Sequence, residues 1–310
     1  MQRMRVRVIA SRDLAIGIRA FDLSPESEYS LPPFRAGDHV SVHLPGEVTR
    51  SYSLVEVSDD WRRFTIVVRK LENGAGSTYL HEKVDVGATL EVGTPANNFR
   101  LHEEASHTVL VAGGIGITPI FAMARRLARL GRSWRLHYAA RSKAHAAFVD
   151  ELSALQGDVR FHFGDNDGRL RLPEIFCAAP HGTHFYCCGP TSMLDEFTAA
   201  APDKAFAHVE RFAGVDEKEV NSAGCSVTLA RSGLTVLVSS GTSIMEALEA
   251  RGVKVPFSCR NGLCGACETR VLAGIPDHRD FVLDDERRAS NETIMICCSG
   301  AISKSLTLDL

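Results

Sequence analysis

The stretch Cys259–Cys267, with the sequence CRNGLCGAC, constrains the fold of this chain more than any other feature. Its three cysteines have the spacing C-x4-C-x2-C, and a fourth, Cys297, follows after 29 further residues. Plant-type [2Fe–2S] ferredoxins use this spacing, because two tetrahedral irons need four thiolates and one tight loop can supply three of them. Such a loop needs small residues so that its backbone N–H groups can face the sulfurs, and it has them in Ser258, Gly262, Gly265 and Ala266.

A zinc site and a set of buried apolar cysteines are the competing interpretations of this loop. Zinc sites favour C-x2-C pairs, whereas the first gap here is four residues. The distant cysteine is doubled, as Cys297 and Cys298, and successive side chains of a strand face opposite ways. We choose Cys297 because the strand-like TIMIC leads to it and its spacing matches. The predicted cluster ligands are therefore Cys259, Cys264, Cys267 and Cys297.

Composition and charge narrow the class of protein. With 310 residues the chain is long enough for two or three domains, and 45% hydrophobic and 24% charged residues are typical of globular proteins. The formal net charge of −3, without a long basic run, gives no indication of a nucleic-acid or membrane partner. The nine cysteines are an odd number, and no export signal precedes them, so we expect a cytoplasmic protein.

One uncharged stretch imitates a membrane span. Residues 105–124 carry no charge, but three glycines and a proline interrupt them: Gly113, Gly114, Gly116 and Pro119. We predict a buried strand, a turn and the start of a helix there.

The pattern along the chain divides it into three regions and a linker. Residues 1–103 show short alternating strands separated by turns, which indicates a barrel or sandwich. In residues 104–214 strands alternate with helices, as in a parallel α/β sheet, and one helix is expected over 144–155. Residues 215–224 are polar and read as a linker. Residues 225–310 hold a hairpin, a helix that starts with the capping box Ser243 and Glu246, the cysteine loop and further strands.

Two motifs of the α/β region follow predicted strands. VLVAGGIGITP places glycines between a buried strand and a helix, where backbone N–H groups can approach a pyrophosphate. It lacks the G-x-G-x-x-G spacing, so a plain tight turn remains an alternative. YCCGP ends a later strand at Cys188, Gly189 and Pro190, the edge at which open α/β sheets bind ligands. Cys188 alone is equally consistent with a buried small residue.

Two motifs of the first region are candidates for binding a phosphorylated ring. RSYSL, residues 50–54, offers an arginine for a phosphate or a carbonyl and a tyrosine for stacking, although an ordinary cross-strand polar set has the same pattern. NGAGST opens a short helix whose N–H groups can bind a phosphate.

In this order, the motifs resemble the phthalate dioxygenase reductase family, and are especially similar to reductase components of vanillate demethylases. The resemblance covers essentially the whole chain: R-x-Y-S at residues 50–53, G-G-x-G-x-T-P at 113–119, C-G-P at 188–190, and the ferredoxin cysteines. It implies a multidomain protein with an antiparallel flavin-binding β-barrel, a Rossmann-like parallel α/β NAD domain and a C-terminal β-grasp ferredoxin domain.

The resemblance also implies the residues that bind each cofactor. Thr118, Cys188 and Glu210 would lie closest to the reacting rings. The flavin would be held by Arg50, Ser51, Tyr52, Ser53, Val67, Val68, Gly74, Gly76, Ser77, Thr78 and Phe212. The nicotinamide nucleotide would be held by Gly113, Gly114, Gly116, Thr118, Pro119, Arg141, Cys188, Gly189 and Pro190.

The choice of flavin and nucleotide rests on finer signs. FMN is expected because Asn97 and Asn98 stand where FAD-type relatives tend to have a single glycine. Arg141 follows a predicted strand and is able to accept the 2′-phosphate of NADPH. The family leans to NADH, and Asp165 and Asp167 add no positive charge nearby, so NADH is expected.

The implied function is that of a cytoplasmic, monomeric reductase component of a Rieske-type oxygenase or demethylase in aromatic catabolism. A hydride carries two electrons and a plant-type cluster accepts one, so a flavin must stand between NADH and the cluster. An FAD reductase for a di-iron monooxygenase and a redox carrier or sensor without turnover are the alternatives. Twelve histidines are scattered at no metal-binding spacing, and we expect His137, His162 and His184 to be core or rim residues.

Overall fold

The computed structural model describes residues 3–26, 34–46, 48–57, 62–164, 170–212, 224–257 and 259–310. By its internal contacts the chain divides into two compact units, Met1–Arg211 and Phe212–Leu310. The predicted linker over 215–224 lies, apart from Gly224, outside the described residues. The domain boundaries at 103, 214 and 225 therefore stay predictions.

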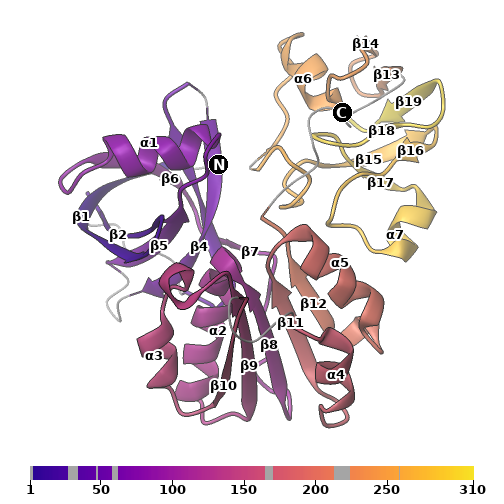
Figure 1. The fold of residues 1–310 in the computed structure, drawn as a ribbon. Helices are drawn as coiled ribbons and strands as arrows, with labels where there is room; N and C mark the ends of the chain where they lie inside the picture. Colours follow the sequence, from indigo (N-terminus) through magenta and orange to yellow (C-terminus); the bar gives the residue numbers. More distant parts are fainter. Residues whose placement is uncertain are drawn as a thin grey trace. The chain divides into compact units, whose positions relative to one another are not determined.

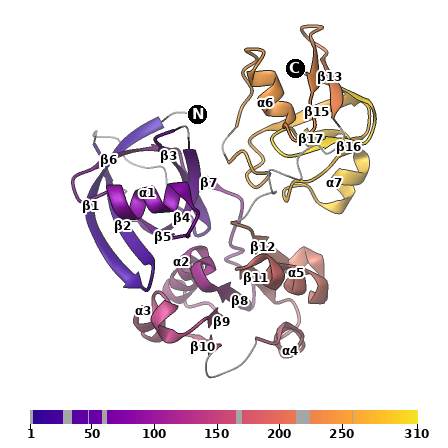
Figure 2. The same ribbon diagram turned by 45° about the horizontal axis from the view of Figure 1, so that its top comes forward.

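The first part of unit 1 is a closed antiparallel barrel (Figure 1). Its sheet has the order β4-β5-β2-β1-β6-β3-β7, and pairing of β4 with β3 closes the ring. Helix α1 lies across one end of the barrel in Figures 1 and 2. The elements are β1 (Arg3–Ala15), β2 (Ile18–Pro25), β3 (Asp38–Leu44), β4 (Val48–Val57), β5 (Phe64–Arg69), α1 (Ala75–Lys83), β6 (Thr89–Gly93) and β7 (Ala96–Asn97).

The second part of unit 1 is a parallel sheet with the strand order β10-β9-β8-β11-β12. Parallel strands need helical crossovers, and these put helices on the faces of the sheet. The elements are β8 (Thr108–Gly113), η1 (Gly114–Gly116), α2 (Ile117–Arg129), β9 (Trp134–Ala140), η2 (Lys143–His145), α3 (Val149–Ser153), β10 (Asp158–Phe163), α4 (Leu172–Cys177), β11 (His184–Cys188), α5 (Thr191–Ala200), η3 (Lys204–Phe206) and β12 (Ala207–Glu210).

Alternate residues of these strands pack into two different cores. Leu110, Tyr186 and Cys188 belong to the core under α2 and α3, which also contains Val55 and Val67 of the barrel. Their neighbours on the same strands belong to a second core, under α4 and α5: Val109, Val111, Phe185 and Cys187. Figure 1 shows these two helices on the opposite face of the sheet from α2 and α3. The two members of the doubled Cys187–Cys188 therefore face opposite sides of the sheet.

Unit 2 contains a mixed sheet with the order β14-β13-β19-β15-β17 and a two-stranded ribbon of β16 and β18. Helix α6 begins at Ser243, which forms the expected capping box with Glu246. The buried core collects residues from the sheet, α6 and the cysteine region. The elements are β13 (Cys225–Leu229), β14 (Thr235–Val238), α6 (Ile244–Glu249), β15 (Glu268–Ala273), β16 (Pro276–Asp277), α7 (Asp285–Ser290), β17 (Thr293–Met295), β18 (Gly300–Ala301) and β19 (Ser305–Leu308).

The structure corrects the predicted helix over 144–155. Only Val149–Ser153 is α-helical, because Phe148 adopts the left-handed conformation with φ 63° and ends the preceding segment. Its ring stacks on Phe121 of α2 with 4.2 Å between centroids, and this core contact outweighs local helix propensity. The uncharged residues 105–124 form β8, η1 and the start of α2. In the described parts of the chain no helix combines the length and the apolarity that crossing a bilayer requires.

Candidate cofactor sites

The cysteine loop directs backbone N–H groups at sulfur atoms. Asn261 and Leu263 donate to Cys259 Sγ at 3.4 and 3.3 Å, and Cys259 donates to Cys264 Sγ at 3.4 Å. Gly262 donates to Cys297 Sγ at 3.3 Å, although 35 positions separate the two in sequence. N–H groups directed at sulfur are what a thiolate-bound iron–sulfur cluster needs around its ligands.

Backbone conformation makes this arrangement possible. Arg260, Gly262 and Gly265 have φ values of 61°, 73° and 74°. A side chain at Gly262 would also collide, since a Cβ there would lie 2.6 Å from Cys298 Sγ. Glycine is therefore required at position 262 by conformation and by space.

The doubled cysteines at 297 and 298 point to different places, but not for the predicted reason. Strand β17 ends at Met295, so residues 296–298 form a turn and strand alternation does not apply. Cys297 Sγ accepts from Gly262 of the loop, whereas Cys298 Sγ contacts the Met295 carbonyl oxygen at 3.7 Å and packs behind Gly262. The turn thus presents Cys297 to the other three cysteines.

Four thiols held this close fit a bound cation. The pKa of Cys259 is raised above its ordinary range by its hydrogen bond with Cys264 and then by burial. The pKa of Cys267 is raised in the same way by Cys297 and by burial. Thiols that oppose each other's ionisation become thiolate ligands once a metal centre supplies positive charge.

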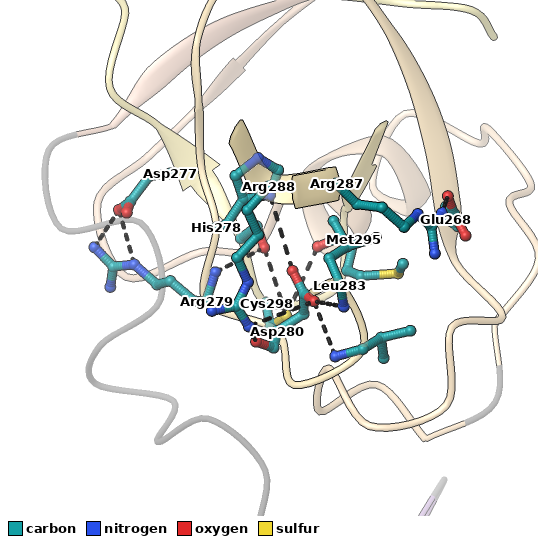
Figure 3. Close-up of polar contacts among 12 residues, drawn as sticks. Glu268, Asp277, His278, Arg279, Asp280, Leu283, Arg287, Arg288, Met295 and Cys298 are labelled. Carbon is teal, nitrogen blue, oxygen red and sulfur yellow. Dashed lines mark hydrogen bonds and ion pairs between the residues drawn. The ribbon is translucent and has the colours of Figure 1, made fainter. Parts of the chain in front are cut away.

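A buried carboxylate, Asp280, lies in the turn that packs against Gly262 of the loop (Figure 3). Asp280 accepts hydrogen bonds from the N–H groups of Val282 and Leu283 at 3.0 and 2.8 Å, and its side chain is fully buried. Figure 3 places it between His278 and Arg288, whose nitrogens lie 3.9 and 4.0 Å from its oxygens. The next residue, Phe281, donates to the Gly262 carbonyl oxygen at 2.9 Å, so this turn holds the loop directly.

The predicted flavin residues on β4 lie at the join of the barrel and the α/β sheet. Tyr52 packs against the barrel core, and burial raises its pKa to about 12. Ser53 pairs across the sheet with His39 of β3. Both are buried, and among the described residues neither Ser53 Oγ nor His39 Nδ1 has a hydrogen-bond partner. Two buried polar atoms without partners fit a polar ring that is bound there.

The other predicted flavin residues lie on β4 itself, on β5 or at the start of α1. Arg50 and Ser51 are exposed, Val67 packs toward α2, and Val68 packs inside the barrel. Gly74 precedes α1, and Ser77 donates to its carbonyl oxygen at 3.1 Å. A Cβ on Gly76 would lie 2.9 Å from Arg50 Cγ, so the turn packs on that arginine. The structure thus brings residues 50–53 and 74–78 together, with Thr78 in the first turn of α1.

The glycine turn and the C-G-P motif touch at the carboxyl edge of the parallel sheet. A Cβ on Gly116 would lie 2.1 Å from the Cys188 carbonyl oxygen, and one on Gly113 would lie 2.7 Å from Pro190 Cδ. Packing between the two strand ends therefore requires glycine at positions 113 and 116. The alternative of a plain tight turn thus explains part of the glycine pattern. Gly114 differs, because it has a φ of 54° and a Cβ there would meet only Arg69 NH1, at 3.9 Å.

Cys188 and Glu210 are neighbours on adjacent strands at this edge. Cys188 is buried and Glu210 is half-buried, and the buried Glu210 Oε2 has no hydrogen-bond partner among the described residues. Burial raises the pKa of Glu210 to about 8 and the pKa of Cys188 well above its usual range. Both groups are therefore neutral at pH 7. Thr118 is buried in the first turn of α2, where its hydroxyl donates to the Ile115 carbonyl oxygen at 3.1 Å.

The remaining predicted residues are less constrained. Arg141 is exposed immediately after β9, at the carboxyl end where the prediction needs it. Gly189 lies in the bend after β11, and Pro119 is buried in the first turn of α2. Phe212 is exposed and is the first residue of unit 2, so its place beside the flavin residues stays a prediction. Asp165 and Asp167 lie outside the described residues.

Sequence reasoning missed His39 and Asp280. Neither belongs to a motif, and each acquires its place through tertiary contact: His39 through pairing with Ser53, and Asp280 through the turn behind Gly262. The only local signal for Asp280 is the run HRDFVLD, in which an aspartate precedes two backbone donors.

Comparison with known proteins agrees with this architecture. Residues 5–101 match the oxidoreductase FAD-binding domain family, and residues 227–301 match the 2Fe-2S iron-sulfur cluster binding domain family. The chain is 47% identical to phenoxybenzoate dioxygenase subunit beta of Ectopseudomonas oleovorans, covering 100% of this chain and 98% of that protein. It is 44% identical to tetrachlorobenzoquinone reductase of Sphingobium chlorophenolicum, covering 96% and 95%.

A solved structure extends the likeness to the fold. The structure of phthalate dioxygenase reductase, described as modular for electron transfer from pyridine nucleotides to [2Fe–2S], superposes with a TM-score of 0.75 at 36% identity and covers 99% of this chain and 98% of that one. With the barrel, the parallel sheet and the cysteine loop in the same order, this chain belongs to the phthalate dioxygenase reductase family, oxidoreductases that pass electrons from a nicotinamide nucleotide through a flavin to a [2Fe–2S] cluster.

Proposed function

We propose that this chain is the reductase component of a two-component Rieske-type oxygenase or demethylase, with NADH as the electron donor and FMN as the flavin. The cysteine loop is the observation that carries the proposal. The N–H groups of its three consecutive residues 261–263 are directed at the sulfurs of Cys259 and Cys297. A protein that only stored or sensed electrons would not need the second site at the sheet edge of unit 1.

Cys259, Cys264, Cys267 and Cys297 are the proposed cluster ligands. The hydrogen bond from Gly262 to Cys297 and the burial of Cys298 behind the loop support Cys297 as the fourth ligand. When bound, the cluster supplies a one-electron carrier, and the surrounding N–H groups stabilise charge on its sulfurs.

Arg50, Ser51, Tyr52, Ser53, Val67, Val68, Gly74, Gly76, Ser77 and Thr78 are the proposed flavin residues, with Phe212 as a further contact. The unpartnered Ser53 hydroxyl supports a ring at β4, and the first turn of α1, which has no acidic residue, supports a phosphate there. FMN is favoured because Asn97 carries a side chain at a place where FAD-type relatives tend to have a glycine. Its side chain accepts from Phe99 N at 3.0 Å and donates to the Ala36 carbonyl oxygen at 3.2 Å.

Gly113, Gly114, Gly116, Thr118, Pro119, Arg141, Cys188, Gly189 and Pro190 are the proposed nucleotide residues. Gly114 leaves backbone accessible beside the start of α2, which suits a pyrophosphate. Neutral Cys188 and neutral Glu210 would line the uncharged nicotinamide end without charge repulsion. The protein's part is to position the donor, since hydride transfer from a dihydronicotinamide needs no general base.

The relatives support an oxygenase as the electron acceptor, since one is a dioxygenase subunit by name. A Rieske centre in that acceptor, a monomeric state and a cytoplasmic location are parts of the proposal. Nine free cysteines in the described chain are consistent with a reducing compartment. The proposed domains are 1–103, 104–214 and 225–310, with 215–224 as the linker.

The deciding experiment is an anaerobic absorption spectrum of the purified protein before and after NADH is added. Bleaching of both the flavin and the iron–sulfur bands is the expected result, and the released flavin should be FMN by chromatography. Flavin bleaching without any cluster signal would contradict the proposal, and FAD in the released fraction would point instead to a reductase for a di-iron monooxygenase. Absence of NADH turnover with an artificial acceptor would leave a carrier or sensor.

A further inference from the structure

Three histidines meet at the edge of the parallel sheet opposite the proposed nucleotide site. His184 begins β11, His208 lies in β12, and His102 lies in the segment that leads to β8. Four residue steps along β11 separate His184 from Cys188, about 13 Å at the usual rise of a strand. The cluster is therefore separate from the residues to which a cofactor has been assigned.

The ring nitrogens of this histidine cluster converge. One nitrogen from each ring lies within 4.8 Å of one from each of the others. His184 Nδ1 and His208 Nε2 share a hydrogen bond of 3.0 Å. A tetrahedral metal with bonds of about 2.0–2.1 Å to nitrogen holds its ligand atoms about 3.4 Å apart. The three rings are close enough to surround one ion, but they have to rotate out of their stacked arrangement, because imidazole binds a metal in the plane of its ring.

Packing holds the three rings next to one another before any ion binds. His102 stacks on His184 and His208 with centroid distances of 4.6 and 5.0 Å, and Tyr186 stacks on His208 at 4.5 Å. The backbone N–H of His102 donates to the Tyr186 hydroxyl at 2.9 Å. The same tyrosine therefore fixes the exposed segment and one of the two strands, which lowers the entropic cost of assembling three ligands.

The hydrogen bond between His184 and His208 is compatible with metal binding. A neutral imidazole is the form that binds metal. The ring that donates in the shared hydrogen bond needs only to move its proton to its other nitrogen, which leaves a lone pair facing the ion.

The surroundings leave one coordination position open. His102 and His184 line an open pocket of about 1310 Å³. The neighbouring carboxylates of Glu103 and Glu104 are paired with Arg126 and Arg132. Further arginines line the same pocket: Arg35, Arg100, Arg125 and Arg129. Water or a small anion from the pocket is able to complete a fourth position, as in zinc sites with three protein ligands.

We propose that His102, His184 and His208 bind one divalent transition-metal ion of the imidazole-preferring class, for which Zn²⁺ is the probe. Imidazole sets suit zinc, copper and nickel, whereas hard ions prefer oxygen ligands. Nothing in the motifs of the chain points to this site, because its ligands come from three separate segments.

The test is a zinc titration of the holoprotein, with flavin and cluster intact, against a competing chelator. The wild type should bind one Zn²⁺ per chain, and zinc-edge absorption should show nitrogen neighbours at about 2.0–2.1 Å rather than sulfur at about 2.3 Å. His102→Ala removes an exposed ligand and should weaken binding at least as much as the roughly 10–100-fold typical of losing a second-shell partner. His184→Ala is the second variant, and His181→Ala, an exposed histidine of the same loop, is the matched control.

NADH-driven dye reduction should stay unchanged in all three variants, which shows that they are folded. Equal zinc affinity in the wild type, His102→Ala and His184→Ala would overturn the proposal. A zinc shell that contains sulfur would overturn it as well, because the ion would then sit on cysteines.

Discussion

The cysteine loop of unit 2 and the sheet edge of unit 1 are built in opposite ways. Three of the four cluster cysteines fall within nine residues, and most N–H groups that face their sulfurs belong to the same loop. At the sheet edge, Gly116, Cys188 and Glu210 come from three different segments and meet only after the strands have paired. The first site is therefore encoded in local spacing, and the second in tertiary packing.

This difference predicts two kinds of failure. A change in the loop should remove the cluster while the rest of the chain keeps its structure, whereas a change at the sheet edge should cost folding free energy as well as nucleotide binding. The variants below are arranged to separate these outcomes.

Cys297→Ser should have the largest effect. NADH-driven reduction of cytochrome c should fall to background because the fourth ligand is lost, while reduction of small dyes by the flavin should remain. Cys298→Ser is the matched control, because Cys298 Sγ faces the Met295 carbonyl oxygen. Both activities and the iron content should be measured together. Loss of cytochrome c reduction in Cys298→Ser with a normal Cys297→Ser would reverse the ligand assignment.

Asp280→Asn tests whether the loop depends on its buried support. Removing the charge leaves Arg288 and His278 without their carboxylate, and breaking a buried pair costs about 3–5 kcal/mol. The free energy of unfolding in urea should fall by less than this amount, because the Arg288 side chain is 35% exposed and water partly screens its charge. The cluster should also be lost faster in air. Asp284→Asn, at the exposed N-cap of α7, is the control. Equal cluster lifetimes in the two variants would show that the loop holds itself.

The same contrast explains what the sequence reveals about the fold. Strand alternation, the strand–helix alternation and the capping box at Ser243 are local, and the structure agrees with each. The helix over 144–155 was wrong because Phe148 takes a left-handed conformation to reach Phe121 in the core. Alternation of Cys297 and Cys298 was a wrong argument, because β17 ends two residues earlier than the pattern indicates.

The sites divide in the same manner. Spacing predicts the cysteine ligands, but it has no means of finding His39, which enters the proposed flavin site only through its cross-strand partner Ser53. The histidines at 102, 184 and 208 are invisible to spacing for the same reason. The expectation that His184 is a core or rim residue agrees with its half-buried place at the start of β11. Residues joined by sheet pairing leave no periodic trace in a single sequence.

Gly116→Ala tests the packed sheet edge. The new Cβ would lie 2.1 Å from the Cys188 carbonyl oxygen, and backbone must move to relieve this contact. The free energy of unfolding should fall by the upper part of the roughly 1–3 kcal/mol typical of overpacking, and the KM for NADH should rise. Gly93→Ala is the control, since its nearest contact would be an ordinary 3.6 Å. If both variants were equally stable, close approach of the two turns would not be the reason for glycine at position 116.

Glu210→Gln should have no effect near pH 4.5, because its effect appears only as a dependence on pH. Burial raises the pKa of Glu210 from 4.5 to about 8, so the neutral acid is the form that the folded protein tolerates. Its stabilising contribution is complete below about pH 4.5 and is lost as the pH rises through about 8, by at most about 1.4 kcal/mol per pH unit. Glutamine has the same size and no charge, so the variant should lose this slope.

The measurement is the free energy of unfolding in urea at intervals from pH 5 to pH 9, for the wild type and Glu210→Gln. The two curves should diverge between pH 5 and about pH 8 and run parallel above that, with the variant the more stable there. Parallel curves would mean that Glu210 ionises freely in the folded chain. The sheet edge would then hold a charged carboxylate beside Cys188, and neutral packing would no longer be the property that distinguishes it from the cysteine loop.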